Sequence, residues 1–311
     1  MNKRSSFILF FCCLTSLLRA QQEASFSLYM FNHQAINPAY VGATGVTQIT
    51  AGTRNQWSGI TGAPETHAFS ISHLVKNKNV GVGLSNVTDN IGPTKRVNIA
   101  VDLSYHLPLN DTGMKLGLGL KVSNRSFRLD PSILSPTTSG DSFLSNTPLD
   151  DSSPNIGFGL YLQNPNFYLG VGLPYFIQDE ELYLNRYYYA IGGFLVNLNS
   201  FVQIKPSILF QKMEANPLVY DVSILFSYQD IFFLGPQYRA NVQNAFPNQN
   251  TAGFYGILTG LNITNNLTIG YAYQGTLANI NIGITNTSHE ILLRFQLGLK
   301  EIGFLRSPRL F

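Results

Sequence analysis

A two-residue alternation of apolar and polar side chains constrains this chain most, and it returns repeatedly from about residue 46 to the end. The segment 97–106 shows the pattern clearly, because Val97, Ile99, Val101, Leu103 and Tyr105 alternate with Asn98, Ala100, Asp102, Ser104 and His106. Successive side chains of a strand point to opposite faces. One face of each such strand therefore prefers hydrocarbon, while the other tolerates water.

The pattern predicts strands over residues 46–56, 64–75, 79–88, 94–107, 114–127, 154–163, 166–173, 187–198, 201–212, 218–228, 230–239, 252–263, 267–276 and 289–300. About fourteen such segments, with turn residues between them, are more than an ordinary sandwich holds. We therefore predict an all-β fold, a transmembrane antiparallel β-barrel of about 14 strands. A secreted soluble β-protein is the alternative, since no single segment exceeds what a sandwich contains.

The connections between these strands differ in length. Those after even-numbered strands are short and rich in Asn, Asp and Gly, which tolerate positive φ: 76–78, 110–113, 164–165, 199–200, 229–230 and 265–266. Those after odd-numbered strands are mostly longer, notably 128–153, 174–186, 240–251 and 277–288. Outer-membrane barrels have short periplasmic turns and long external loops. The pattern thus predicts an outer-membrane location, with both termini periplasmic and the four long segments outside.

The first twenty residues have the layout of a signal peptide. Lys3 and Arg4 precede the apolar run 7–18, which is too short to span a bilayer, and Ala20 is a suitable residue before a cleavage point. A retained anchor helix is the alternative. We expect three parts: a signal peptide over 1–20, a periplasmic N-terminal leader over 21–45 and the barrel over 46–311.

Cleavage changes the composition of the mature chain. Cys12 and Cys13 leave with the signal, which excludes a disulfide, a thiolate nucleophile and a cysteine metal site. Three cations leave as well, so the 20 basic residues fall to 17 and equal the 17 acidic ones. No basic field remains to attract nucleic acid. Charged residues make up 12% and aromatic residues 13% of the chain, which suits a lipid-facing wall with aromatic girdles and outer-membrane lipid as a partner.

Neither glycines nor histidines form a catalytic pattern. The G-x-G pairs 81/83, 117/119, 157/159 and 170/172 lack the strand–turn–helix setting and the third glycine of a nucleotide site, so we predict close packing inside the barrel. The five histidines and their neighbours show no spacing typical of a catalytic or metal site. We therefore predict that the protein is not an enzyme and holds no cofactor or metal.

The leader does not alternate. It contains Tyr29-Met30-Phe31-Asn32 and then Ile36-Asn37-Pro38-Ala39-Tyr40-Val41-Gly42, in which Asn-Pro is a turn signal. Its aromatic and aliphatic side chains are unfavourable in water. The leader should therefore dock either into the barrel mouth or onto a partner.

Behind the leader stand Gln56-Trp57, Gly59 and Gly62-Ala63-Pro64, which fit a Q-W-x-G-x-x-G-A-P stretch. Together with the leader, this motif resembles the PorP/SprF family of outer-membrane proteins attached to the type IX secretion system of Bacteroidota. The resemblance covers essentially the whole mature chain. Family members often carry an acidic residue after a Tyr-x-Tyr near the C-terminus, where this chain has Gln274.

The resemblance implies an accessory, non-enzymatic role. The expected partners are exported cargo with a C-terminal sorting domain, such as gliding adhesins, and other type IX secretion components. The protein would support export of cargo, hold cargo at the cell surface, or link the outer membrane to periplasmic motor components. The residues assigned to partner binding are Tyr29, Met30, Phe31, Asn32, Asn37, Pro38, Tyr40, Gln56 and Trp57. A leader that merely plugs the barrel is the structural alternative, and a diffusion channel or small-solute transporter is the functional one.

Overall fold

The computed structural model describes residues 25–75, 78–130, 150–179, 185–214, 216–242, 253–276 and 287–298. The predicted signal peptide lies outside these residues, as do most of the four long connections. The described residues contain no helix with the length and hydropathy that crossing a membrane requires.

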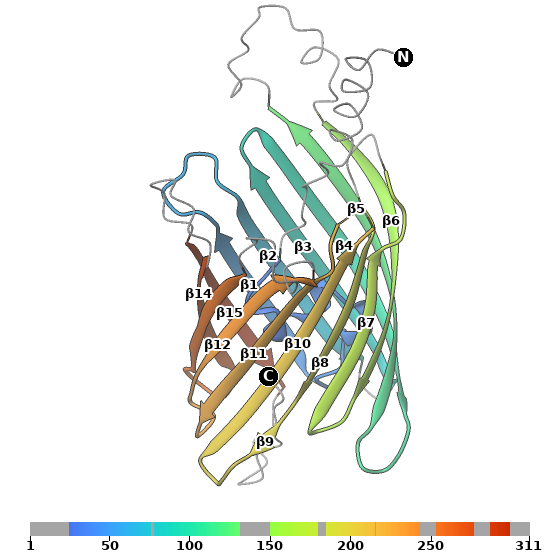
Figure 1. Cartoon of the computed structure of the whole chain (residues 1–311). Coiled ribbons are helices and arrows are strands. Elements are labelled where there is room, and N and C mark those ends of the chain that lie inside the picture. Colours follow the sequence, from blue (N-terminus) through green and yellow to red (C-terminus); the bar gives the residue numbers. More distant parts are fainter. Residues whose placement is uncertain are drawn as a thin grey trace, which may run out of the picture.

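The strands form one closed antiparallel barrel (Figure 1). They are β1 Thr47–Asn55, β2 Glu65–Val75, β3 Val80–Ile91, β4 Thr94–Pro108, β5 Lys115–Leu129, β6 Asp150–Gln163, β7 Phe167–Tyr175, β8 Tyr187–Phe194, β9 Val196–Asn197, β10 Val202–Met213, β11 Val219–Tyr228, β12 Phe232–Asn241, β13 Phe254–Asn262, β14 Leu267–Thr276 and β15 Ser288–Leu297. Since β8 and β9 both pair with β10, they are one interrupted strand, and the barrel has 14 strands. Pairing of β1 with β15 closes it, as the sequence predicted.

Each predicted strand is present, and the ends differ by a few residues. The largest difference is at β6, which begins at Asp150, inside the segment predicted as the loop 128–153. Asp151 pairs with Phe127 of β5 there, although the Asp-Ser sequence lacks alternation. β5 itself runs to Leu129, and its backbone hydrogen bonds extend β6 to Asp150. The side-chain pattern of residues 150–153 does not indicate a strand.

The two faces of the wall have the chemistry that the alternation predicts. On β4 the outward Ile99 and Val101 are 59% and 49% exposed in the protein alone, which suits contact with lipid. The inward Asp102 and Ser104 are buried. Along β4 the lumen is therefore lined by polar and small side chains.

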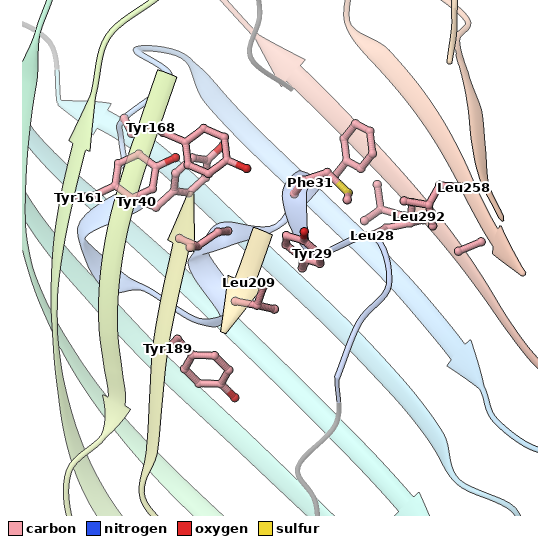
Figure 2. Packing of buried hydrophobic residues seen from close by; sticks show 14 of the residues in the cluster. Leu28, Tyr29, Phe31, Tyr40, Tyr161, Tyr168, Tyr189, Leu209, Leu258 and Leu292 are labelled. Carbon is pink, nitrogen blue, oxygen red and sulfur yellow. The ribbon is translucent and has the colours of Figure 1, made fainter. Parts of the chain in front are cut away.

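The leader lies inside this lumen. It forms three short 3₁₀ helices: η1 Tyr29–Phe31, η2 His33–Ala35 and η3 Pro38–Tyr40. The Asn-Pro turn signal is realised at η3, where the Asn37 side chain accepts a hydrogen bond from the Ala39 N–H. Figure 2 shows the leader ribbon crossing the interior between opposite walls of the barrel.

The leader runs through the lumen from one end of the barrel to the other. We call the end with the connections 109–114, 164–166, 198–201 and 263–266 the turn end, and the opposite one the loop end. The backbone of Ser27 contacts Glu290 near the loop end, whereas Val41 contacts His106 near the turn end. Both termini were expected at the turn end. Because the leader runs back through the lumen before β1 begins, the first described residues lie near the loop end; that both termini are periplasmic stays a prediction.

Candidate functional site

The apolar half of the leader packs between facing walls. Leu28, Tyr29, Met30 and Phe31 are all buried. The ring centroid of Phe31 lies 5.0 Å from that of Phe233 on β12. Burial of such side chains stabilises by roughly 1.5–3 kcal/mol each relative to exposure. The lumen thus contains a hydrophobic core that the alternating wall alone does not provide.

An aromatic cluster continues this core on the opposite wall (Figure 2). His33 Nδ1 is hydrogen-bonded to the Tyr161 hydroxyl at 2.9 Å. The rings of Tyr40 and Tyr161 meet edge to face, with centroids 5.4 Å apart. Tyr168 stacks on Tyr161 with centroids 5.9 Å apart. Edge-to-face and stacked pairs of this kind favour one orientation of the leader.

Two amide side chains bind the barrel wall through its backbone. Gln34 Nε2 donates to the Leu84 carbonyl at 3.1 Å and to Asp102 Oδ2 at 2.9 Å. Asn37 Nδ2 donates to the Leu160 and Val171 carbonyls at 2.9 and 3.2 Å. Both side chains are buried, so each satisfies polar groups that water does not reach.

The loop-end part of the leader is held through its main chain. Glu290 accepts hydrogen bonds from the N–H groups of Ser27 and Leu28 at 2.6 and 2.9 Å. Arg54 approaches the same carboxylate at 3.3 Å, and Arg239 Nη2 donates to the Phe26 carbonyl at 2.8 Å. One anion and two cations therefore fix this stretch, mainly through its backbone, and Arg54 Nη1 also donates to the Ser27 hydroxyl at 2.7 Å.

The turn-end part is fixed in the same manner. The Val41 carbonyl accepts hydrogen bonds from Ser104 Oγ at 2.5 Å and His106 Nε2 at 2.6 Å. The Gly42 N–H donates to Ser72 Oγ at 2.8 Å. His106 is buried against the leader.

The glycine pairs make room for the leader. A Cβ added at Gly119 would lie 2.1 Å from the Ala39 nitrogen, and one added at Gly159 would lie 2.0 Å from Asn37 Oδ1. A Cβ at Gly172 would lie 2.2 Å from the Ile36 carbonyl oxygen. The predicted close packing inside the barrel is confirmed at these positions, and its partner is the leader: its backbone at Gly119 and Gly172 and the Asn37 side chain at Gly159.

Buried ion pairs surround the leader. Besides Arg54–Glu290, Lys121 Nζ lies 2.8 Å from Asp102 and Arg239 Nη2 lies 2.6 Å from Asp221. These charges are nearly inaccessible to solvent, so each requires its partner. Gln274, which stands where family members often carry an acid, accepts a hydrogen bond from Arg54 Nη2 at 2.5 Å.

The sequence predicted partner binding for nine residues. The seven leader residues Tyr29, Met30, Phe31, Asn32, Asn37, Pro38 and Tyr40 are buried in the lumen, so the first of the two predicted docking modes is the one in the structure. Gln56 is half-buried and Trp57 is 43% exposed, both in the connection at the loop end. Partner binding by these nine residues stays a prediction.

Backbone hydrogen bonds fix the connection that carries Trp57. The Ser58 N–H donates to the Thr287 carbonyl at 3.0 Å, and the Gly92 N–H donates to the Gly62 carbonyl at 2.9 Å. Trp57 itself has φ 51°, a conformation that non-glycine residues seldom adopt. A rigid loop therefore presents this indole at the surface.

Sequence reasoning missed the wall residues that hold the leader, namely Arg54, Lys121, Asp102, Asp221, Arg239 and Glu290. A signal for them was available. Each is a charge on the inward face of a strand, where the neighbouring inward positions carry mostly small or uncharged polar residues. Charges of both signs on such a face indicate internal ion pairs.

Known structures show the same kind of fold. The chain resembles a TodX monoaromatic hydrocarbon channel mutant with 10% identity and TM-score 0.51, covering 85% of this chain and 93% of that one. It resembles the CymD monoaromatic hydrocarbon channel with 11% identity and TM-score 0.50, covering 86% and 91%. The outer membrane protein Omp33 of Acinetobacter baumannii follows with 10% identity and TM-score 0.48, covering 81% and 97%. The TodX and CymD similarities establish the outer-membrane barrel fold alone.

No curated protein matches the chain. The sequence model described as type IX secretion system membrane protein PorP/SprF matches residues 18–295. This match spans the leader, the Gln56-Trp57 loop and nearly all of the barrel, which agrees with the resemblance drawn from the motifs. The chain therefore belongs to the PorP/SprF family of type IX secretion system membrane proteins.

Proposed function

We propose that this protein is a non-enzymatic scaffold of the type IX secretion system in the outer membrane. It supports export or surface anchoring of cargo with a C-terminal sorting domain, gliding adhesins included, and links that cargo to periplasmic components. The observation that carries this proposal is the leader, which occupies the lumen and is bonded to opposite walls. A barrel occupied in this way is suited to holding partners at its two ends.

A diffusion channel is the competing function, because TodX and CymD are described as monoaromatic hydrocarbon channels. Their identity with this chain is 10–11%, so what they transport does not transfer. The buried leader disfavours an open pore, since its removal would break hydrogen bonds to several strands. We therefore keep the scaffold as the principal function.

In this proposal the two ends of the barrel have different partners. The loop end faces outward and contacts cargo, in keeping with the usual asymmetry of outer-membrane barrels. The turn end faces the periplasm. Gln56 and Trp57 lie at the loop end, so we assign them to the cargo side.

Affinity purification from native cells in mild detergent tests this assignment. We expect a surface protein with a C-terminal sorting domain to copurify with the full chain. Trp57→Ala should lower its recovery about tenfold, because an accessible tryptophan on a rigid loop is a typical binding hot spot. Phe201→Ala is the matched control, since Phe201 is 56% exposed at the turn end.

Equal recovery with both variants would remove Trp57 from the cargo site. Absence of any such cargo from the unmodified protein, together with robust open-pore current in planar bilayers, would favour the channel.

A further inference from the structure

Side chains of the barrel wall hold the leader by its main chain, as a receptor holds a peptide. Near the loop end, Glu290 accepts the N–H groups of two consecutive leader residues, and Arg239 donates to the Phe26 carbonyl. Gln237 donates to the Ser27 carbonyl at 3.2 Å. Hydrogen bonds to the main chain supply affinity for a peptide whatever its side chains are. This part of the wall is therefore suited to more than one sequence.

The wall groups at the loop end are held in place by one another. Arg239 pairs with Asp221 at 2.6 Å, and Gln237 donates to both oxygens of the same carboxylate at 2.8 and 2.9 Å. Arg54 pairs with Glu290 at 3.3 Å. Two cations and two anions thus balance without any charge from the leader. Such a set is preorganised to bind an uncharged main chain.

One side chain of the leader is recognised specifically. A Cβ at Gly159 or at Gly170 would overlap the amide group of Asn37. This amide donates to the Leu160 and Val171 carbonyls of the wall, and its oxygen accepts a hydrogen bond from the leader's own main chain. The two glycines leave room for an amide, and the two carbonyls require a donor. An asparagine therefore fits this position, and an apolar side chain would leave buried carbonyls unsatisfied.

The joint between the leader and β1 is open. Gly45 is exposed, and a Cβ added there would meet no atom within 4 Å. Exposed stretches of this kind are where a chain tolerates insertion and cleavage. Cleavage at this joint would leave the leader attached to the barrel by non-covalent contacts alone.

We propose that the lumen is a peptide-binding site, that the leader occupies it as an intramolecular ligand, and that a segment of another polypeptide with the same chemistry can replace the leader. That chemistry is an apolar stretch like residues 28–31, followed by an asparagine at the position of Asn37. The class of ligand follows from the occupant, since the preorganised groups of the wall are bonded to a peptide. A tethered leader has a high effective concentration, so the competing segment has to be in excess.

Peptide exchange in the folded full chain tests the proposal. A protease recognition sequence inserted at Gly45 allows the leader to be cut from the barrel after folding in mild detergent. Native mass spectrometry should show that the cut leader stays bound, and that an excess of an isotope-labelled peptide of residues 25–44 replaces it. The same peptide with Asn37→Ala should compete at least about tenfold more weakly, because two wall carbonyls lose their donor.

The peptide with Ala35→Ser is the matched control. Ala35 is only half-buried, so this peptide should compete like the leader sequence. Heat-modifiable migration on gels verifies folding. If the insertion prevents folding, cross-linking of photoreactive copies of the same peptides to the unmodified full chain gives the same comparison.

Three results would each overturn the peptide site. They are loss of the cut leader from the folded barrel, no exchange or cross-linking by the leader peptide, and equal competition by a peptide of scrambled sequence. No cargo takes part in this experiment. Its failure is therefore distinct from failure of the scaffold function, which copurification of cargo tests.

Discussion

Deleting residues 25–44 should convert a closed barrel into a conducting one. In planar bilayers the full chain is expected to give no open-pore current, whereas the deletion variant should give stepwise current without any partner. The physical reason is that the leader occupies the lumen and is bonded to β15 through Ser27, to β4 through Gln34 and to β6 through Asn37. The polar inward face of the wall would then contact water.

The deletion also removes the hydrophobic contacts of Leu28 to Phe31, so folding has to be verified by heat-modifiable migration. A second variant, in which residues 28–41 are replaced by an equal length of Gly and Ser, keeps the connection while removing the packing. It should conduct as well. If both variants fold but neither gives open-pore current, the leader is not what seals the barrel.

Glu290→Ala should lower the free energy of unfolding by about 3–5 kcal/mol, the range measured when one partner of a buried ion pair is removed. Glu290 accepts two leader N–H groups and balances Arg54, whose side chain is 3% exposed. Without it, a buried guanidinium loses its paired carboxylate and two buried N–H donors lose their acceptor. Unfolding by urea in detergent, followed by gel migration, measures the difference.

Glu65→Ala is the control for this experiment. Glu65 also lies beside a basic side chain, His67 at 3.4 Å, but both side chains are about half exposed on the outer face. Exposed pairs of this kind contribute little, so we expect a change within about 0.5 kcal/mol. Equal effects of the two substitutions would show that the Glu290 contacts do not hold the leader in place.

The strands could be predicted because alternation is a local property. Val97 to His106 form a strand in the structure for the same reason that their sequence indicates one: along β4 the wall separates an apolar outer face from a polar inner face. The start of β6 at Asp150 could not be predicted, since it depends on pairing with Phe127 rather than on its own side chains.

The site was predictable in part. The leader was identified because Tyr29 and Phe31 break the alternation, and close packing at the G-x-G pairs was expected from Gly119 and its companions. The contact between the leader and these glycines joins residues far apart in the sequence, and residue spacing alone does not predict it. The direction of the leader could not be predicted for the same reason: only the contacts of Ser27 and Val41 with opposite ends of the barrel reveal it.

A disulfide between leader and wall tests the central claim most directly. Asn32 Oδ1 accepts a hydrogen bond from Ser70 Oγ of β2 at 3.1 Å, so the variant Asn32→Cys/Ser70→Cys should form a cross-link in oxidised outer membranes. Asn32→Cys/Ser227→Cys, which places the second thiol on the inward face of β11, should not. Mass spectrometry of the linked peptides decides between them. Efficient linkage of the first pair alone is the result that a leader in the lumen predicts, and absence of linkage in the first pair, or equal linkage in both, would contradict it.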